Sequence, residues 1–97
     1  MKKFDIQLTY SAVEDLDCLP EDRQTKIVAL IKKISFNPFA SETSIKKLKG
    51  FKPPLYRIRS GDFRVLYRVQ QKTITIMRVI DRKDLDRVIK GLKLSKA

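Results

Sequence analysis

Between residues 55 and 80, apolar and polar residues alternate over three short stretches, which is the pattern of strands that bury one face. The stretches and the turn signals between them are residues 55–59, Ser60-Gly61, residues 63–69, residues 70–72 and residues 73–80. Strands joined by such short turns pair antiparallel. The chain is therefore expected to fold around an antiparallel sheet that the remaining residues must cover.

The N-terminal part predicts a strand over residues 3–9 and then a helical hairpin. Ser11 and Glu14 have the spacing of a capping box, which predicts the start of a first helix. Pro20 ends this helix and suits the first turn of a second one, which Asn37-Pro38 closes. The residues expected to face the core are Ala12, Val13, Leu16, Leu19, Ile27, Leu30, Ile31 and Ile34.

Asp81 and Asp84 predict the start of a C-terminal helix with Leu85, Val88, Ile89 and Leu92 on one face. The order β-α-α-β-β-β-α predicts an α+β fold, with a mainly antiparallel sheet and the N-terminal helical hairpin packed on one face. No linker or repeat divides the sequence, so residues 1–97 are expected to form a single domain.

Several classes of protein are excluded by what the sequence lacks. It has no histidine and one cysteine, Cys18, so histidine-based catalysis, histidine–metal centres and an internal disulfide are excluded. We expect neither a metal nor a cofactor. No apolar run has the roughly 18–20 residues of a membrane span, and an acid, Asp5, interrupts any signal-peptide core. A cytoplasmic protein without a membrane partner is expected.

The net charge of +11 is concentrated in one half of the chain. Residues 1–45 hold six Lys and Arg against seven acids, whereas residues 46–97 hold sixteen against four. Such asymmetry is typical of proteins that bind a polyanion. The polyanion can be either a nucleic acid or an acidic protein, and the charge alone does not distinguish them.

The arginines of the first two central strands share the face opposite the aromatic residues. A two-residue turn at Ser60-Gly61 places Arg59 opposite Asp62, where the two side chains can pair, and Arg57 opposite Arg64. Like charges across a sheet repel. A phosphate between Arg57 and Arg64 would replace that repulsion with charge-assisted hydrogen bonds. For Arg68 two interpretations stay open: it belongs to the same row of arginines as Arg57 and Arg64, or it lies at the solvent-exposed edge of that row.

Four segments, together with the predicted helical hairpin that ends at Asn37-Pro38, form a recognisable pattern. They are Lys47-Leu48-Lys49-Gly50, Tyr56-Arg57-Ile58-Arg59, Gly61 to Tyr67, and Val79 through Arg82-Lys83. In these segments and over essentially its whole length, the chain resembles the RelE/ParE superfamily of bacterial type II toxins, its RelE branch in particular. The resemblance implies a toxin that enters the ribosomal A site and cuts mRNA. In that metal-free reaction the ribose 2′-OH attacks the adjacent phosphorus and the 5′-oxygen leaves.

The resemblance also implies roles for particular residues. Arg57 and Arg59 match the basic pair of the family's first hairpin strand, Arg64 the arginine that stabilises the phosphorane-like charge, and Arg82 the arginine at the leaving oxygen. Further residues expected to bind RNA phosphates are Lys47, Lys49, Arg68 and Lys83. The implied partners are an acidic antitoxin, the ribosome with its mRNA, and operator DNA reached through the antitoxin in a hetero-oligomer.

The sequence also departs from the family. Asp81 stands where many relatives have His or Lys, and Asp86 where many have Tyr. Arginine hardly deprotonates in proteins, so none of the four arginines supplies a general base. Three functions therefore stay open: a RelE-like mRNA endoribonuclease, a ParE-like non-enzymatic inhibitor of DNA gyrase, and a degenerate toxin that binds antitoxin or RNA without cutting.

Overall fold

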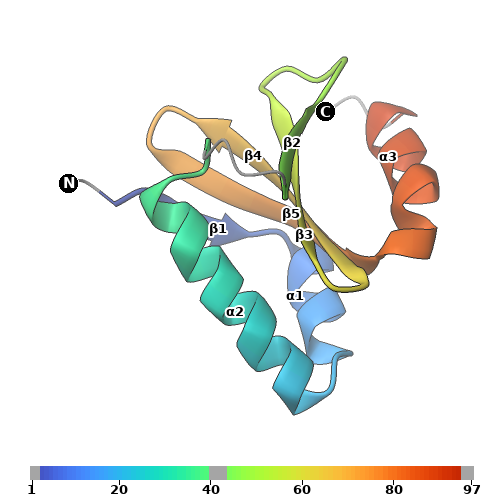
Figure 1. Ribbon diagram of the computed structural model, residues 1–97. Coiled ribbons are helices and arrows are strands. Elements are labelled where there is room, and N and C mark those ends of the chain that lie inside the picture. Colours follow the sequence, from blue (N-terminus) through green and yellow to red (C-terminus); the bar gives the residue numbers. More distant parts are fainter. Residues whose placement is uncertain (1–2, 40–43, 95–97) are drawn as a thin grey trace.

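The computed structural model describes residues 3–39 and 44–94, with nothing said of the side chain of Leu94 (Figure 1). Its elements in chain order are β1 (Asp5–Leu8), α1 (Tyr10–Asp17), α2 (Glu21–Phe36), β2 (Ile45–Leu48), β3 (Leu55–Ser60), β4 (Phe63–Gln70), β5 (Thr73–Asp81), a 3₁₀ turn (Arg82–Asp84) and α3 (Leu85–Leu94).

The five strands form one sheet in the order β1-β5-β4-β3-β2. β1 pairs parallel with β5, and the other pairs are antiparallel. The predicted α+β fold with a mainly antiparallel sheet is confirmed. The sequence did not indicate β2, because its four residues are two adjacent lysines between Ile45 and Leu48 and carry no alternation. β2 nevertheless pairs with β3 and extends the sheet at that edge.

The two faces of the sheet are covered by different helices, with α1 and α2 on one side and α3 on the other (Figure 1). On the first face, Ala12, Ile27 and Ile34 are buried against strand residues that include Val65 and Tyr67. The predicted packing of the helical hairpin on one face is thus confirmed. Burial of this apolar surface is the main stabilising contribution to the fold.

The second face carries a smaller core under α3. Val88 of α3 is buried with Leu55, Leu66 and Ile80 of the sheet. Leu66 lies on the face that bears the arginines, and α3 covers it there, so this face is apolar under the helix and basic beside it. The sequence had indicated the apolar stripe of α3 but not which face of the sheet it covers.

The first helix begins earlier than its capping box predicts. Thr9 is the N-cap residue, and its Oγ1 accepts a hydrogen bond of 3.0 Å from the backbone N–H of Ala12. The prediction that Ser11 caps this helix is therefore wrong. Val13 is 42% exposed, so its assignment to the core was wrong as well, because Ala12 and Leu16 provide the inward face of this short helix.

The β3–β4 turn lies one residue later than predicted. Ser60 pairs with Phe63, so the turn residues are Gly61 and Asp62, and Gly61 has a φ of 57°, which glycine adopts without strain. Arg59 consequently lies opposite Arg64 and not opposite Asp62. The shift in register is two residues, which keeps every side chain on its predicted face.

Candidate functional site

The β3–β4 hairpin and the start of the 3₁₀ turn bring four arginines together. Arg59 and Arg64 are directly opposite each other, and Arg57 precedes Arg59 by two positions on the same face of β3. Arg82 follows β5, and its charge acts on Arg64 together with those of Arg57 and Arg59. We call these four residues the arginine cluster. They are the four residues predicted to carry the chemistry.

Arg64 is the most buried member of the cluster, with 7% of its surface exposed. Its Nη1 donates hydrogen bonds to the carbonyl oxygens of Gly61 at 3.0 Å and Phe63 at 2.9 Å. The guanidinium is thus held by the backbone of its own hairpin turn. Its remaining N–H groups have no hydrogen-bond partner among the residues that the structure describes, so they are donors for an external anion.

The electrostatic surroundings of Arg64 are unfavourable to its charge. Burial lowers the pKa of the guanidinium, and the charges of Arg57, Arg59 and Arg82 lower it further, while Asp62 opposes them. Even so, arginine keeps its proton in proteins. The folded chain therefore holds a cation at a place where an anion would relieve the repulsion between like charges.

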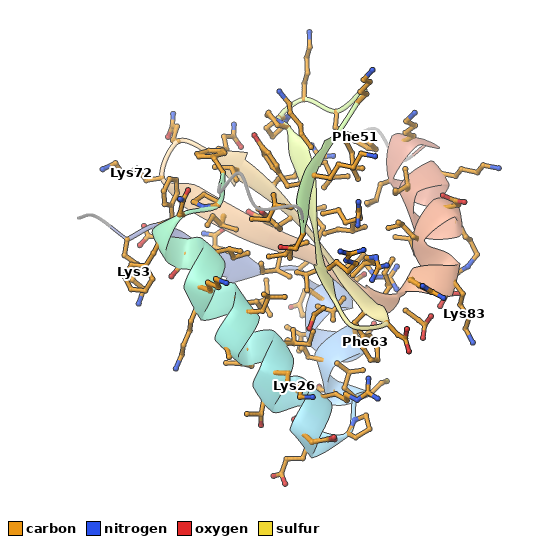
Figure 2. The ribbon with its side chains drawn as sticks, in the orientation of Figure 1. Lys3, Lys26, Phe51, Phe63, Lys72 and Lys83 are labelled. Atoms are coloured by element: carbon orange, nitrogen blue, oxygen red, sulfur yellow. The ribbon has the colours of Figure 1, made fainter. Side chains whose placement is uncertain are left out.

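Arg82 is placed by a contact between two distant parts of the chain. Its backbone N–H donates a 2.8 Å hydrogen bond to the carbonyl oxygen of Asp62, which ties the end of β5 to the β3–β4 turn. Asp81 precedes it, and its Oδ1 accepts a 3.0 Å hydrogen bond from the backbone N–H of Lys83. Asp81 is the N-cap of the 3₁₀ turn. Figure 2 shows nitrogen-bearing side chains gathered between this hairpin and α3, near the labelled Phe63 and Lys83.

No member of the cluster forms an ion pair with a carboxylate of residues 3–39 or 44–94. The expected pair between Arg59 and Asp62 is absent, because the register places Arg59 opposite Arg64. By contrast, Arg78 on β5 pairs with Asp15 of α1, with 2.7 Å between Nε and Oδ2. Among the described residues, therefore, no carboxylate pairs with the cluster, although Asp15 pairs with an arginine elsewhere.

The remaining basic residues named from the sequence are placed differently from one another. On β2, Lys46 is opposite Arg57 and shares its face, whereas Lys47 is opposite Tyr56 on the other face. Lys49 is exposed in the turn after β2. Lys46 is thus the nearest addition to the arginine row, and sequence reasoning missed it because β2 itself was not recognised.

Arg68 and Lys83 lie at opposite ends of the cluster's face. The Arg68 guanidinium stands 5.6 Å from the centroid of the Phe51 ring, and its Nη1 donates a 3.3 Å hydrogen bond to the carbonyl oxygen of Pro53. These contacts hold the segment between β2 and β3 against the sheet. Lys83 is exposed beside Arg82.

Comparison with known proteins decides the family. Residues 6–86 match the family described as the ParE toxin of the type II toxin–antitoxin system parDE. A protein of Methanocaldococcus jannaschii named "Putative toxin RelE1" is 37% identical over 84 residues, covering 84% of this chain and 92% of the relative.

The chain belongs to the RelE/ParE family of type II toxins.

Solved structures of the family share the fold of this toxin. The archaeal RelE–RelB complex of Pyrococcus horikoshii has a chain of 27% identity that aligns with a TM-score of 0.72, over 84% of this chain and 97% of that one. A double mutant of E. coli RelE in the free state aligns with a TM-score of 0.76 at 16% identity, over 98% of this chain and all of its own, which shows the shared fold.

The toxin's cluster is rich in groups that bind a phosphate and poor in groups that accept a proton. Tyr67 is fully buried and donates a 2.9 Å hydrogen bond to the carbonyl oxygen of Pro38, and burial raises its pKa well above its usual range. It is a core residue, as its position in the alternation predicted.

Among the described residues, no group of three or more acidic or cysteine side chains is arranged to hold a metal ion. None of the described helices is long and apolar enough to cross a membrane.

Proposed function

We propose that this toxin is a ribosome-dependent mRNA endoribonuclease whose arginine cluster binds the scissile phosphate. The observation that carries the proposal is Arg64, which is buried, fixed by two turn carbonyls and surrounded by three further guanidiniums without a described carboxylate partner. Fixed donors aimed at a developing negative charge are a large source of rate enhancement in phosphoryl chemistry.

In the proposed reaction the ribose 2′-oxygen forms a bond to phosphorus and the bond from phosphorus to the 5′-oxygen breaks. Arg64 and the pair Arg57 and Arg59 stabilise the extra charge of the pentacoordinate phosphorane. Arg82 lies at the leaving 5′-oxygen and stabilises its charge until it takes up a proton. Because arginines do not accept protons, the 2′-OH proton passes to water or to a group of the ribosome.

An antitoxin partner is supported by the solved relatives. The Pyrococcus horikoshii structure is a RelE–RelB complex, and another relative of 26% identity belongs to the RelBE2 toxin–antitoxin complex of Mycobacterium tuberculosis. We propose that an acidic antitoxin covers the basic half of this toxin in the cytoplasm and carries it to operator DNA in a hetero-oligomer. The net charge of +11 favours such a cover.

The test is cleavage of mRNA on programmed ribosomes by the purified toxin, with 5′ ends mapped along the message. Arg64→Ala should lower the rate by about 10²–10³-fold, the usual effect of removing a donor to a developing charge. Arg87→Ala is the matched control, because Arg87 is an exposed residue of α3 whose ion-pair partner among the described residues is Asp84. Equal cleavage by both variants, or none by the parent toxin, would refute the enzymatic proposal.

A ParE-like inhibitor of DNA gyrase is the second candidate, favoured by the family whose model matches residues 6–86. It predicts gyrase-trapped DNA breaks and an SOS response while translation continues. Radiolabelled amino-acid incorporation and DNA-break assays after induction separate the two functions, and a chain that causes neither effect is a degenerate toxin.

A further inference from the structure

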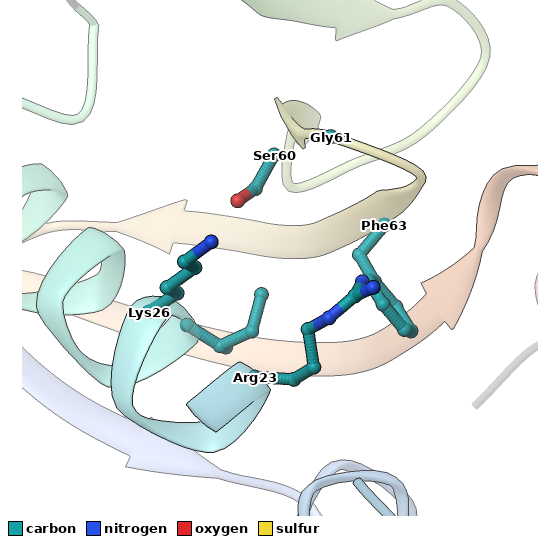
Figure 3. A pocket seen from close by; sticks show the side chains of 6 residues that line it. Arg23, Lys26, Ser60, Gly61 and Phe63 are labelled. Atoms are coloured by element: carbon teal, nitrogen blue, oxygen red, sulfur yellow. The ribbon is translucent and has the colours of Figure 1, made fainter. Parts of the chain in front are cut away.

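A small pocket lies on the side of the β3–β4 turn opposite the arginine cluster (Figure 3). It has a volume of about 90 Å³, well above the roughly 10–15 Å³ that one water requires. Its lining residues are Arg23, Lys26, Ile27, Ser60, Gly61 and Phe63. We call it the turn pocket.

The lining of the turn pocket suits a small anion. Arg23 and Lys26 bring two positive charges from consecutive turns of α2, and Ser60 adds a hydroxyl from β3. Figure 3 shows the Lys26 amine and the Ser60 hydroxyl pointing toward the same space. No carboxylate lines the pocket, and within the described ranges neither Arg23 nor Lys26 has an ion-pair partner.

One of the two cations is positioned in advance. The Arg23 guanidinium stands 5.3 Å from the centroid of the Phe63 ring, a contact that restrains the side chain without neutralising its charge. Ile27 is 1% exposed and closes the pocket on the side of the core. A charged group held in place loses less conformational entropy when it binds a ligand.

The turn pocket and the arginine cluster are built on the same residues of the hairpin end. Ser60 and Phe63 are a cross-strand pair whose side chains point toward α2, and the next pair inward is Arg59 and Arg64, which points to the opposite face. Only the exposed turn, Gly61 and Asp62, separates the two sites. A chain passing over this turn meets both of them.

We propose that the turn pocket is a second phosphate site, which takes a further backbone phosphate of the single-stranded RNA whose scissile phosphate is held by the arginine cluster. The inference rests on the proposed function, since it needs RNA at the cluster. Positively charged grooves that follow a backbone are how proteins bind single strands without reading sequence. The site therefore adds affinity and direction to the bound strand, not base preference.

The first experiment measures the affinity of a short RNA with a 2′-deoxy block at the scissile position. The variant Arg23→Gln/Lys26→Gln should weaken binding about tenfold, the effect of losing one well-held charge-assisted contact. The salt dependence of its log affinity should flatten by about 0.7, the contribution of one phosphate in a single strand. The control Lys32→Gln/Lys72→Gln removes the same charge from exposed positions on α2 and the β4–β5 turn, and should change affinity less than about twofold.

The second experiment uses inorganic phosphate alone. Titrated into the ¹⁵N-labelled toxin, it should shift the amide signals of Ser60 and Gly61 in a saturable way, and chloride at equal ionic strength should not. The glutamine double variant should lose this shift, and Arg23→Lys/Lys26→Arg should retain it because both charges remain.

The outcomes separate this inference from the proposed function. If Arg64→Ala loses RNA affinity while the glutamine double variant binds like its control, the cluster stands and the turn pocket is not an RNA site. A phosphate shift without any loss of RNA affinity overturns the inference in the same way and assigns the pocket to another anion, such as a carboxylate of a protein partner. If neither Arg64→Ala nor the double variant changes RNA binding, the proposed function fails with it.

Discussion

Arg64, which is buried, and Arg78, which is partly buried, lie on the neighbouring strands β4 and β5 and have opposite electrostatic surroundings. Arg78 donates from Nε and Nη2 to the carboxylate of Asp15, at 2.7 and 3.1 Å, and this contact raises its pKa. Arg64 donates only to backbone carbonyls among the described residues, and burial and the like charges of Arg57, Arg59 and Arg82 lower its pKa against the opposing charge of Asp62. Arg78 is neutralised by a carboxylate of the fold, whereas Arg64 has no carboxylate partner among the described residues.

The largest expected effect on stability comes from breaking the ion pair between Arg78 and Asp15. The Asp15 carboxylate accepts two hydrogen bonds from Arg78 and a third, of 2.9 Å, from the backbone N–H of Val79. Asp15→Ala leaves a partly buried guanidinium and a backbone donor without partners, which should cost about 2–4 kcal/mol of unfolding free energy. Urea denaturation checks this, and a loss below about 0.5 kcal/mol would mean that the pair contributes nothing.

An anion bound at the arginine cluster should stabilise the folded toxin. At matched ionic strength, phosphate should raise the unfolding free energy relative to chloride by about 1.4 kcal/mol when its concentration is ten times its dissociation constant. Thermal melts measure the difference. The gain should shrink in Arg64→Ala and persist in Arg87→Ala, and an equal gain in both variants would mean that phosphate acts away from the cluster.

Removing one charge from the cluster should relieve repulsion. Arg57 has no described ion pair, and it lowers the pKa of Arg64. We therefore expect Arg57→Gln to stabilise the free toxin, by less than about 1 kcal/mol, while weakening its RNA binding. Denaturation and RNA titration on the same preparation test whether stability rises while RNA affinity falls. A variant that loses both stability and affinity contradicts this expectation.

The smallest expected effect distinguishes the two lysines of β2. Lys46→Gln should weaken RNA binding about threefold and flatten its salt dependence by about 0.7, because Lys46 lies beside Arg57. Lys47→Gln, on the other face, should change the affinity less. The reverse order would show that the RNA follows a different face of β2.

The sequence predicted most of the framework because the framework depends on local patterns. The alternation over residues 55–80, the stripe of α2 and the apolar face of α3 each follow from spacing within one element. β2 has no such pattern, and its existence depends on pairing with β3. The register of the hairpin was misjudged because Ser60-Gly61 and Gly61-Asp62 are both acceptable turns, and the fold selects the second.

The four arginines of the candidate site could be predicted from the sequence, but the contacts that hold them together could not. The alternation alone placed Arg57, Arg59 and Arg64 on one face. The inclusion of Arg82 came from family resemblance, and the physical cause is the hydrogen bond from its N–H to the carbonyl of Asp62, twenty residues earlier, which no local pattern reveals. The turn pocket joins α2 to the hairpin across the core, so it too required the tertiary structure.

The most direct test of the central claim is the equilibrium affinity for RNA with a blocked 2′ position, measured from low to physiological salt. If the cluster is built to hold a phosphate, Arg64→Ala should bind about tenfold more weakly than the parent toxin, with a shallower salt dependence, whereas Arg87→Ala should match the parent. Equal affinities and equal salt dependences for these two variants would contradict the account.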